Sequence, residues 1–123
     1  MIKGLIVGHK DIGEAMLRAV KSISGDDKEL FFISINELSS KEVAEKIIDF
    51  VDSGSNDRTI IFVDIYGGSC WRAAKHAGLG KNRIVTGFNL PMLLSFINKR
   101  NSIGFDELPA VLENDGKRGI ISE

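Results

Sequence analysis

Four short apolar runs alternate with segments of helical periodicity, and this alternation is the feature that most constrains how the chain can fold. The runs cover residues 2–7, 30–35, 59–63 and 84–86. Short apolar strands separated by amphipathic helices are typical of a mostly parallel sheet covered by helices. We therefore predict an α/β fold in which a single-domain, mostly parallel β-sheet is flanked by helices.

Capping residues and helix breakers mark the helices between these runs. The predicted helices are residues 12–23 ahead of Gly25, the segment between a Ser39–Glu42 capping box and Gly54, residues 69–78, the segment that begins at Pro91, and residues 105–112. Pro109 lies inside the last of these and is tolerated only in its first turn. At the end of the chain, residues 119–122 are a candidate for a short edge strand.

The composition is that of an ordinary globular domain and excludes several classes of protein. Of the 123 residues, 43% are hydrophobic and 27% are charged, and the net charge of -1 gives no broad field for nucleic acid or an anionic membrane. A single cysteine, Cys70, leaves neither a disulfide framework nor a cysteine-rich metal site, and we expect no metal and no cofactor. Because no run approaches about 18 apolar residues and no signal-peptide pattern is present, we expect a cytoplasmic protein without direct membrane insertion.

Two predicted strands end at residues suited to chemistry. His9 follows the run 2–7 and Asp64 follows the run 59–63, and functional groups of open α/β sheets gather at the carboxyl ends of the strands. A neutral imidazole is a nucleophile that can carry a phosphoryl group, and a carboxylate that accepts the Nδ1 hydrogen fixes its tautomer. His9 and Asp64 are therefore the predicted catalytic pair. Asp11 is the nearer alternative carboxylate, although its position favours capping the first helix.

The turn after Asp64 is a candidate anion receptor. Gly67 and Gly68 let the backbone approach a ligand closely, and N–H groups at the start of the following helix attract negative charge. Ser69 adds a hydroxyl that can donate to a phosphoryl oxygen. The alternative is a tight strand-to-helix turn in which Ser69 only caps the helix. No Walker lysine follows, which excludes a nucleotide P-loop, and we interpret Cys70 as a small packing residue rather than a reactive thiol.

Three segments, in this order and spacing, resemble a known family. They are the apolar strand that ends in His9, residues 62–69 and residues 87–93. Together they resemble the mannose-type IIA subunits of the bacterial phosphoenolpyruvate:sugar phosphotransferase system (PTS), and the resemblance covers nearly the whole chain, so that residues 1–123 would form one IIA domain. Two positions depart from the common pattern, because Lys10 and Cys70 stand where many members have glycine and proline.

The resemblance implies a phosphotransferase that carries phosphoryl groups for sugar transport. His9 would accept a phosphoryl group from the phosphorylated phosphocarrier HPr and pass it to a IIB domain, and through it serve the IIC/IID transporter. Asp64 would orient His9, and the turn at residues 67–69 would receive the phosphoryl oxygens. The resemblance also implies a homodimer in which a C-terminal edge strand containing residues 120 and 121 is exchanged between subunits.

The residues alone leave two other classes of protein open. In a receiver-like signalling domain Asp64 would itself take the phosphoryl group, but the acidic pair that would hold a metal ion after the first strand is replaced by Gly8-His9-Lys10. A flavodoxin-like binding module is supported by the fold alone, and the sequence lacks a dinucleotide glycine fingerprint.

Apolar residues within 93–97 occupy more than one stripe of the predicted fourth helix, which indicates a subunit interface.

Overall fold

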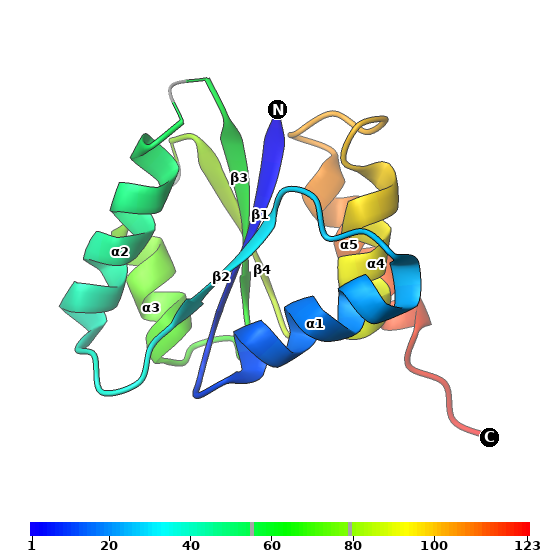
Figure 1. Ribbon diagram of the computed structural model, residues 1–123, viewed down its shortest axis with the longest axis horizontal. Helices are drawn as coiled ribbons and strands as arrows, with labels where there is room; N and C mark the ends of the chain where they lie inside the picture. The colour runs from blue at the N-terminus through cyan, green and yellow to red at the C-terminus, as the bar shows by residue number, and fades with distance from the viewer. Residues whose placement is uncertain (55, 79) are drawn as a thin grey trace.

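A computed structural model describes residues 1–54, 56–78 and 80–123, and in these residues a four-stranded parallel sheet lies between two layers of helices (Figure 1). The strands are β1 (Ile2–Gly8), β2 (Leu30–Ser34), β3 (Arg58–Val63) and β4 (Asn82–Thr86). The helices are α1 (Ile12–Ser24), α2 (Ser40–Asp52), α3 (Ser69–His76), α4 (Leu90–Lys99) and α5 (Leu108–Arg118). The strand order is β2-β1-β3-β4, with α2 and α3 on one face and α1, α4 and α5 on the other. The predicted α/β class is confirmed.

Each face of the sheet has its own apolar core. Successive side chains of β1 point to opposite faces, so Leu5 packs with α2 and α3 whereas Ile6 packs with α1, α4 and α5. Gly4 allows α4 to lie close to β1, because a Cβ there would stand 2.9 Å from Leu30 Cδ1 and 2.9 Å from Phe96 Cε2. Burial of the central strands on both faces explains why the strand sequences are nearly continuous apolar runs.

The capping signals located the first two helices correctly. Gly25 ends α1 in the left-handed conformation with φ of 74°, and its N–H donates to the carbonyl of Lys21. At the start of α2, the Ser39 hydroxyl accepts from the N–H of Glu42 while the Glu42 carboxylate accepts from the N–H of Ser39. Both hydrogen bonds of the predicted capping box are therefore present.

The boundaries of the last two helices differ from the prediction. Asn89 caps α4 by accepting from the N–H of Met92, so Pro91 is the second helical residue rather than the first. The last helix covers Leu108–Arg118 instead of residues 105–112. Pro109 has no N–H and fits only the first turn, so the helix can begin only just before it, and residues 105–107 form a turn.

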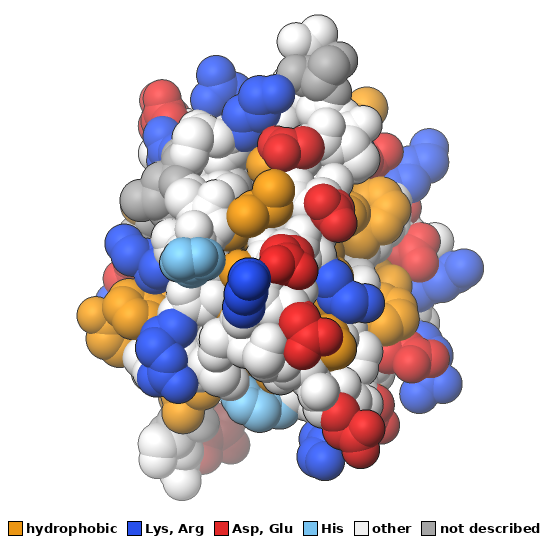
Figure 2. All heavy atoms as spheres, turned by 90° about the vertical axis from the view of Figure 1, so that its left-hand side faces the viewer, with side chains coloured by type: hydrophobic (Ala, Val, Ile, Leu, Met, Phe, Trp, Pro, Cys, Tyr) orange, Lys and Arg blue, Asp and Glu red, His pale blue; other side chains and the backbone are white. Residues whose placement is uncertain are grey.

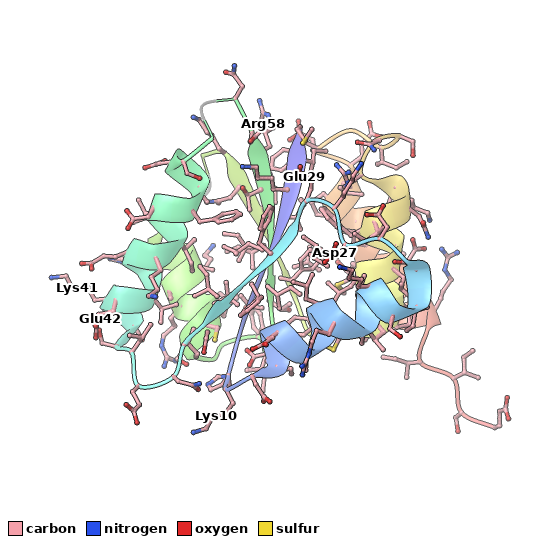
Figure 3. All side chains as sticks on the ribbon, viewed as in Figure 1. Lys10, Asp27, Glu29, Lys41, Glu42 and Arg58 are labelled. Atoms are coloured by element: carbon pink, nitrogen blue, oxygen red, sulfur yellow. The ribbon has the colours of Figure 1, made fainter. Side chains whose placement is uncertain are left out.

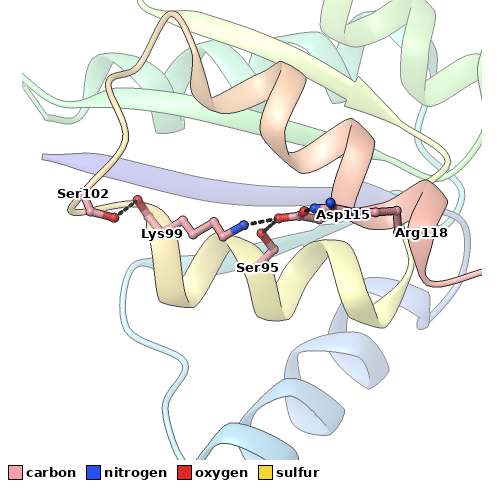
Figure 4. A network of polar contacts seen from close by, with 5 residues as sticks. All are labelled: Ser95, Lys99, Ser102, Asp115 and Arg118. Carbon is pink, nitrogen blue, oxygen red and sulfur yellow. Dashed lines mark hydrogen bonds and ion pairs between the residues drawn. The ribbon is translucent and has the colours of Figure 1, made fainter.

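A polar network holds α5 against α4 (Figure 4). The Asp115 carboxylate on α5 accepts hydrogen bonds from Ser95 and from Lys99 on α4, the latter with an Nζ–Oδ2 distance of 2.7 Å. Arg118 donates to the other carboxylate oxygen. The bonds from Lys99, Ser95 and Arg118 hold the pKa of Asp115 well below its usual range, so the network requires an ionised carboxylate.

One expectation about the outer surface is wrong, and the exchanged strand expected at the end of the chain needs a second subunit to form. The apolar residues of 93–97 do not form an open face, because Leu93 and Phe96 are fully buried where α4 packs between α1 and α5. Residues 119–122 form no strand, and Ile120 and Ile121 are 76% and 74% exposed. An edge strand needs a neighbouring strand to pair with, and this segment extends away from the sheet of its own chain (Figure 1).

The exposed surface agrees with the near-zero net charge. On the face that carries α2 and α3, acidic and basic side chains are interspersed and neither sign forms a continuous patch (Figure 2). In the described part of the chain, no helix combines the length and the apolar character needed to cross a membrane.

Candidate functional site

The site lies at the carboxyl ends of the two central strands. β1 and β3 are parallel neighbours, with Val7 paired to Val63, so the residues that follow them emerge side by side at one edge of the sheet. Gly8 leaves room at this point, because a Cβ there would stand 2.4 Å from Cγ2 of Ile12. The predicted convergence of His9 and Asp64 is therefore what the structure shows.

One oxygen of Asp64 holds His9 twice. Asp64 Oδ2 lies 2.6 Å from His9 Nδ1 and also accepts the His9 backbone N–H at 2.9 Å. Burial raises the pKa of Asp64, but the hydrogen bonds and the charge of His9 outweigh it and the net pKa lies below its usual value. An ionised carboxylate can only accept hydrogen bonds, so Nδ1 is the nitrogen that carries the hydrogen.

The opposite ring nitrogen is free to react. With Nδ1 bound to Asp64, the neutral ring has its lone pair on Nε2, and the His9 side chain is 53% exposed. The Ser69 Oγ lies 3.3 Å from Nε2. The arrangement thus presents a nucleophilic nitrogen toward solvent beside a hydroxyl group.

The turn at residues 67–69 brings the Ser69 hydroxyl to the ring of His9. Gly67 has φ of 80°, which favours glycine, and Arg72 donates to its carbonyl at 3.1 Å. Gly68, rather than Ser69, occupies the N-cap position of α3. Ser69 is therefore the first helical residue, and its hydroxyl contacts His9 instead of capping the helix.

Three other residues near His9 in the sequence or the fold, Asp11, Lys10 and Cys70, do not hold its ring. Asp11 is exposed and stands at the N-cap position of α1 without a side-chain capping bond. The carboxylate that holds the ring is that of Asp64. Lys10 points away from the body of the molecule (Figure 3). Cys70 is fully buried with Sγ 3.9 Å from His9 Nδ1. Burial, and next the charge of Asp64, raise the pKa of its thiol to about 12, which agrees with a packing residue.

Tyr66, to which the sequence pattern assigned no role, follows Asp64 by two residues and packs against Trp71. Its ring lies 5.0 Å from that of Trp71 and its side chain is 71% exposed. An aromatic residue next to a glycine turn was the available signal. Both rings line a groove of about 820 Å³, which residues of β4 and α5 also line.

Comparisons with known proteins were consistent with this geometry. A family model described as the PTS system fructose IIA component matches residues 3–113. A curated relative, the sorbose-specific EIIA component of the PTS from Klebsiella pneumoniae, is 24% identical over 112 residues, which cover 88% of this chain and 82% of that protein.

Solved structures match over nearly the whole chain. The phosphotransferase system component EIIA from Streptococcus agalactiae superposes with a TM-score of 0.91 at 22% identity, covering 99% of this chain and 97% of the other. The mannose/sorbose-specific IIA subunit from Enterococcus faecalis superposes with a TM-score of 0.85 at 23% identity, covering 98% and 93%. These likenesses confirm the fold.

Proposed function

The chain belongs to the mannose-type IIA family of the sugar phosphotransferase system, and on that premise we propose that His9 is its phosphoryl-carrying residue. His9 accepts the phosphoryl group from phosphorylated HPr and passes it to a IIB domain, which serves the IIC/IID transporter. The observation that carries this proposal is the 2.6 Å contact between Nδ1 and Asp64 Oδ2, which leaves Nε2 as the exposed nucleophile.

The transfer would use His9, Asp64 and the turn at residues 67–69. The Nε2 lone pair forms a bond to phosphorus while the bond between phosphorus and the donor breaks, and the ring becomes positively charged. Asp64 stabilises that charge through the Nδ1 hydrogen. The Ser69 hydroxyl and the backbone N–H groups of the turn at residues 67–69 receive the phosphoryl oxygens. Transfer to the IIB domain is the same step in reverse.

The receiver-like alternative gains little from the geometry. Its acceptor would be Asp64, whose side chain is only 13% exposed and whose Oδ2 already accepts two hydrogen bonds from His9. Its other oxygen, Oδ1, is buried, so the carboxylate would have to break the bonds to His9 or turn outward before it could attack phosphorus.

The direct test is phosphorylation with phosphoenolpyruvate, the general phosphotransferase enzyme and HPr. We expect one phosphoryl group on the wild-type protein, no labelling of His9→Ala, and normal labelling of His76→Ala, the matched control at the chain's other histidine. The adduct should resist alkali and be lost in acid, as phosphohistidine is. Labelling that survives His9→Ala would contradict the assignment, and loss to hydroxylamine would indicate an acyl phosphate on Asp64.

We further propose that the protein is a homodimer in which residues 119–122 of each subunit pair with the other subunit. The outer edge of β4 pairs with no strand in the described residues. The groove beside it includes Ile84, Val85 and Thr86 in its lining, and Ile120 and Ile121 are exposed at the end of the chain. The outer edge of β4 can therefore accept residues 119–122 of a second subunit as a further strand.

A further inference from the structure

Cys70 and the proposed phosphoryl site together form a cluster of three metal-ligating groups. The ligand atoms of His9, Asp64 and Cys70 all lie within 4.8 Å of one another, and the distance from His9 Nδ1 to Cys70 Sγ is 3.9 Å. Ligands at about 2.0–2.3 Å from a tetrahedral zinc ion lie about 3.3–3.8 Å from each other. The three atoms would fit around one ion if the distance between His9 Nδ1 and Asp64 Oδ2 increased from 2.6 Å to about 3.3 Å.

Asp64 and Cys70 supply the buried part of this cluster. The Asp64 side chain is 13% exposed, its Oδ1 is buried, and Cys70 is fully buried. The carboxylate also accepts a hydrogen bond from the backbone N–H of Ile65, which helps to lower its pKa. A cation between the carboxylate and the thiol would therefore be shielded from solvent on one side.

We propose that His9, Asp64 and Cys70 bind a zinc-class divalent cation, with solvent as the fourth ligand, and that this ion inhibits the phosphoryl carrier. One nitrogen, one oxygen and one sulfur ligand suit Zn²⁺, whereas Mg²⁺ prefers oxygen ligands alone. The binding part of the proposal stands on the cluster alone, and the inhibitory part rests on the proposed function.

The charges of the site balance when the ion is bound. On coordination the thiol proton leaves to solvent, and the two charges of the ion are matched by one carboxylate and one thiolate. The bound site therefore carries no net charge, whereas the metal-free site carries the charge of Asp64.

The ion and the phosphoryl group exclude each other through the ring tautomer. An ion on Nδ1 takes the lone pair of that nitrogen, so the hydrogen of the neutral ring moves to Nε2, where Ser69 Oγ at 3.3 Å can accept it. Nε2 then has no lone pair with which to attack phosphorus. The proposed carrier is active only when the ion has left.

Binding can be tested on the unphosphorylated protein without any PTS partner. We expect one Zn²⁺ per chain in a calorimetric titration, no binding of Mg²⁺, and with Co²⁺ a near-ultraviolet thiolate-to-cobalt charge-transfer band. Cys70→Ala should lose the band and weaken zinc binding by about 10–100-fold or more. Cys70→Ser serves as the less disruptive variant, and His76→Ala, which removes the histidine outside the cluster, should bind as the wild type does.

Inhibition is then measured as the ratio of labelling rates with and without Zn²⁺ for each protein. The ratio should fall in the wild type and stay near one in Cys70→Ala. A wild-type cobalt complex without the thiolate band, or equal zinc affinity in Cys70→Ala, would overturn the metal site. A protein that binds zinc as described but is never labelled by phosphorylated HPr would instead overturn the proposed function and leave the metal site standing.

Discussion

Replacing Asp64 with asparagine tests how His9 is held and stabilised during phosphoryl transfer. Asp64 Oδ2 accepts both the backbone N–H and the Nδ1 hydrogen of His9. An amide oxygen at the same place can keep both bonds and the same ring tautomer, but it removes the negative charge that faces the ring. The fold should persist, whereas the positively charged ring formed during transfer loses its partner.

The size of the effect follows from the hydrogen bond between His9 Nδ1 and Asp64 Oδ2. A hydrogen bond to a charged partner contributes about 1.5–3 kcal/mol, compared with about 0.5–1.5 kcal/mol between neutral groups. The difference of about 1–2 kcal/mol corresponds to a rate about 5–30-fold slower. A separate Coulomb contribution is small, because the His9 side chain is 53% exposed and solvent screens the charges. An amide that turns its NH2 toward the ring would slow transfer further, since it stabilises the wrong tautomer.

Single-turnover transfer from radiolabelled phosphorylated HPr, followed by rapid quenching, measures this rate. The loss in Asp64→Asn should lie in the maximal transfer rate rather than in the HPr concentration that gives half of it, because the docking surface is unchanged. Asp11→Asn is the matched control, and its rate should stay within about twofold of the wild type. A wild-type rate in Asp64→Asn would refute the reasoning and show that the ring needs no carboxylate partner.

Three further predictions concern the fold. Deleting residues 119–123, which spares the Arg118 contact, should shift the protein from dimer to monomer in sedimentation velocity; a full-length protein that sediments as a monomer would contradict the exchanged strand. Gly67→Ala forces a left-handed conformation on alanine and should lower the free energy of unfolding by about 1 kcal/mol in urea titrations while slowing the labelling of His9. Asp115 has a lowered pKa in the folded state, so its stabilisation is present above the unfolded pKa and lost as the pH falls. The difference in Tm between the wild type and Asp115→Asn should shrink below about pH 4, and a difference independent of pH would argue against an ionised network.

The sequence was a good guide where local chemistry decides the outcome. The four apolar runs predicted the strands because central parallel strands are buried on both faces, and the Ser39–Glu42 pair located a helix start because its two hydrogen bonds are local. The approach of His9 and Asp64 was also predictable, since parallel strands place their carboxyl ends at one edge of the sheet.

Tertiary packing decided what the sequence did not predict. The apolar stripes of α4 were interpreted as an interface because nothing in the sequence indicates that α1 and α5 cover both sides of it. The sharing of one Asp64 oxygen by two donors of His9, and the position of Cys70 beside them, follow from the relative placement of β1, β3 and α3. The same holds for Ser69, whose hydroxyl contacts the ring only because Gly68 takes the capping position.

The register between β1 and β3 is what sets the geometry of the site. Val7 pairs with Val63, and a slip of one residue would move Asp64 by about 3.3 Å along the strand and turn its side chain to the other face of the sheet. β3 cannot slip without exchanging the residues of the two cores, because Ile60 and Phe62 pack in one core whereas Ile61 and Val63 pack in the other, and all four are fully buried. The two apolar cores therefore act on function directly: by fixing this register they hold a half-exposed imidazole within hydrogen-bond distance of its carboxylate.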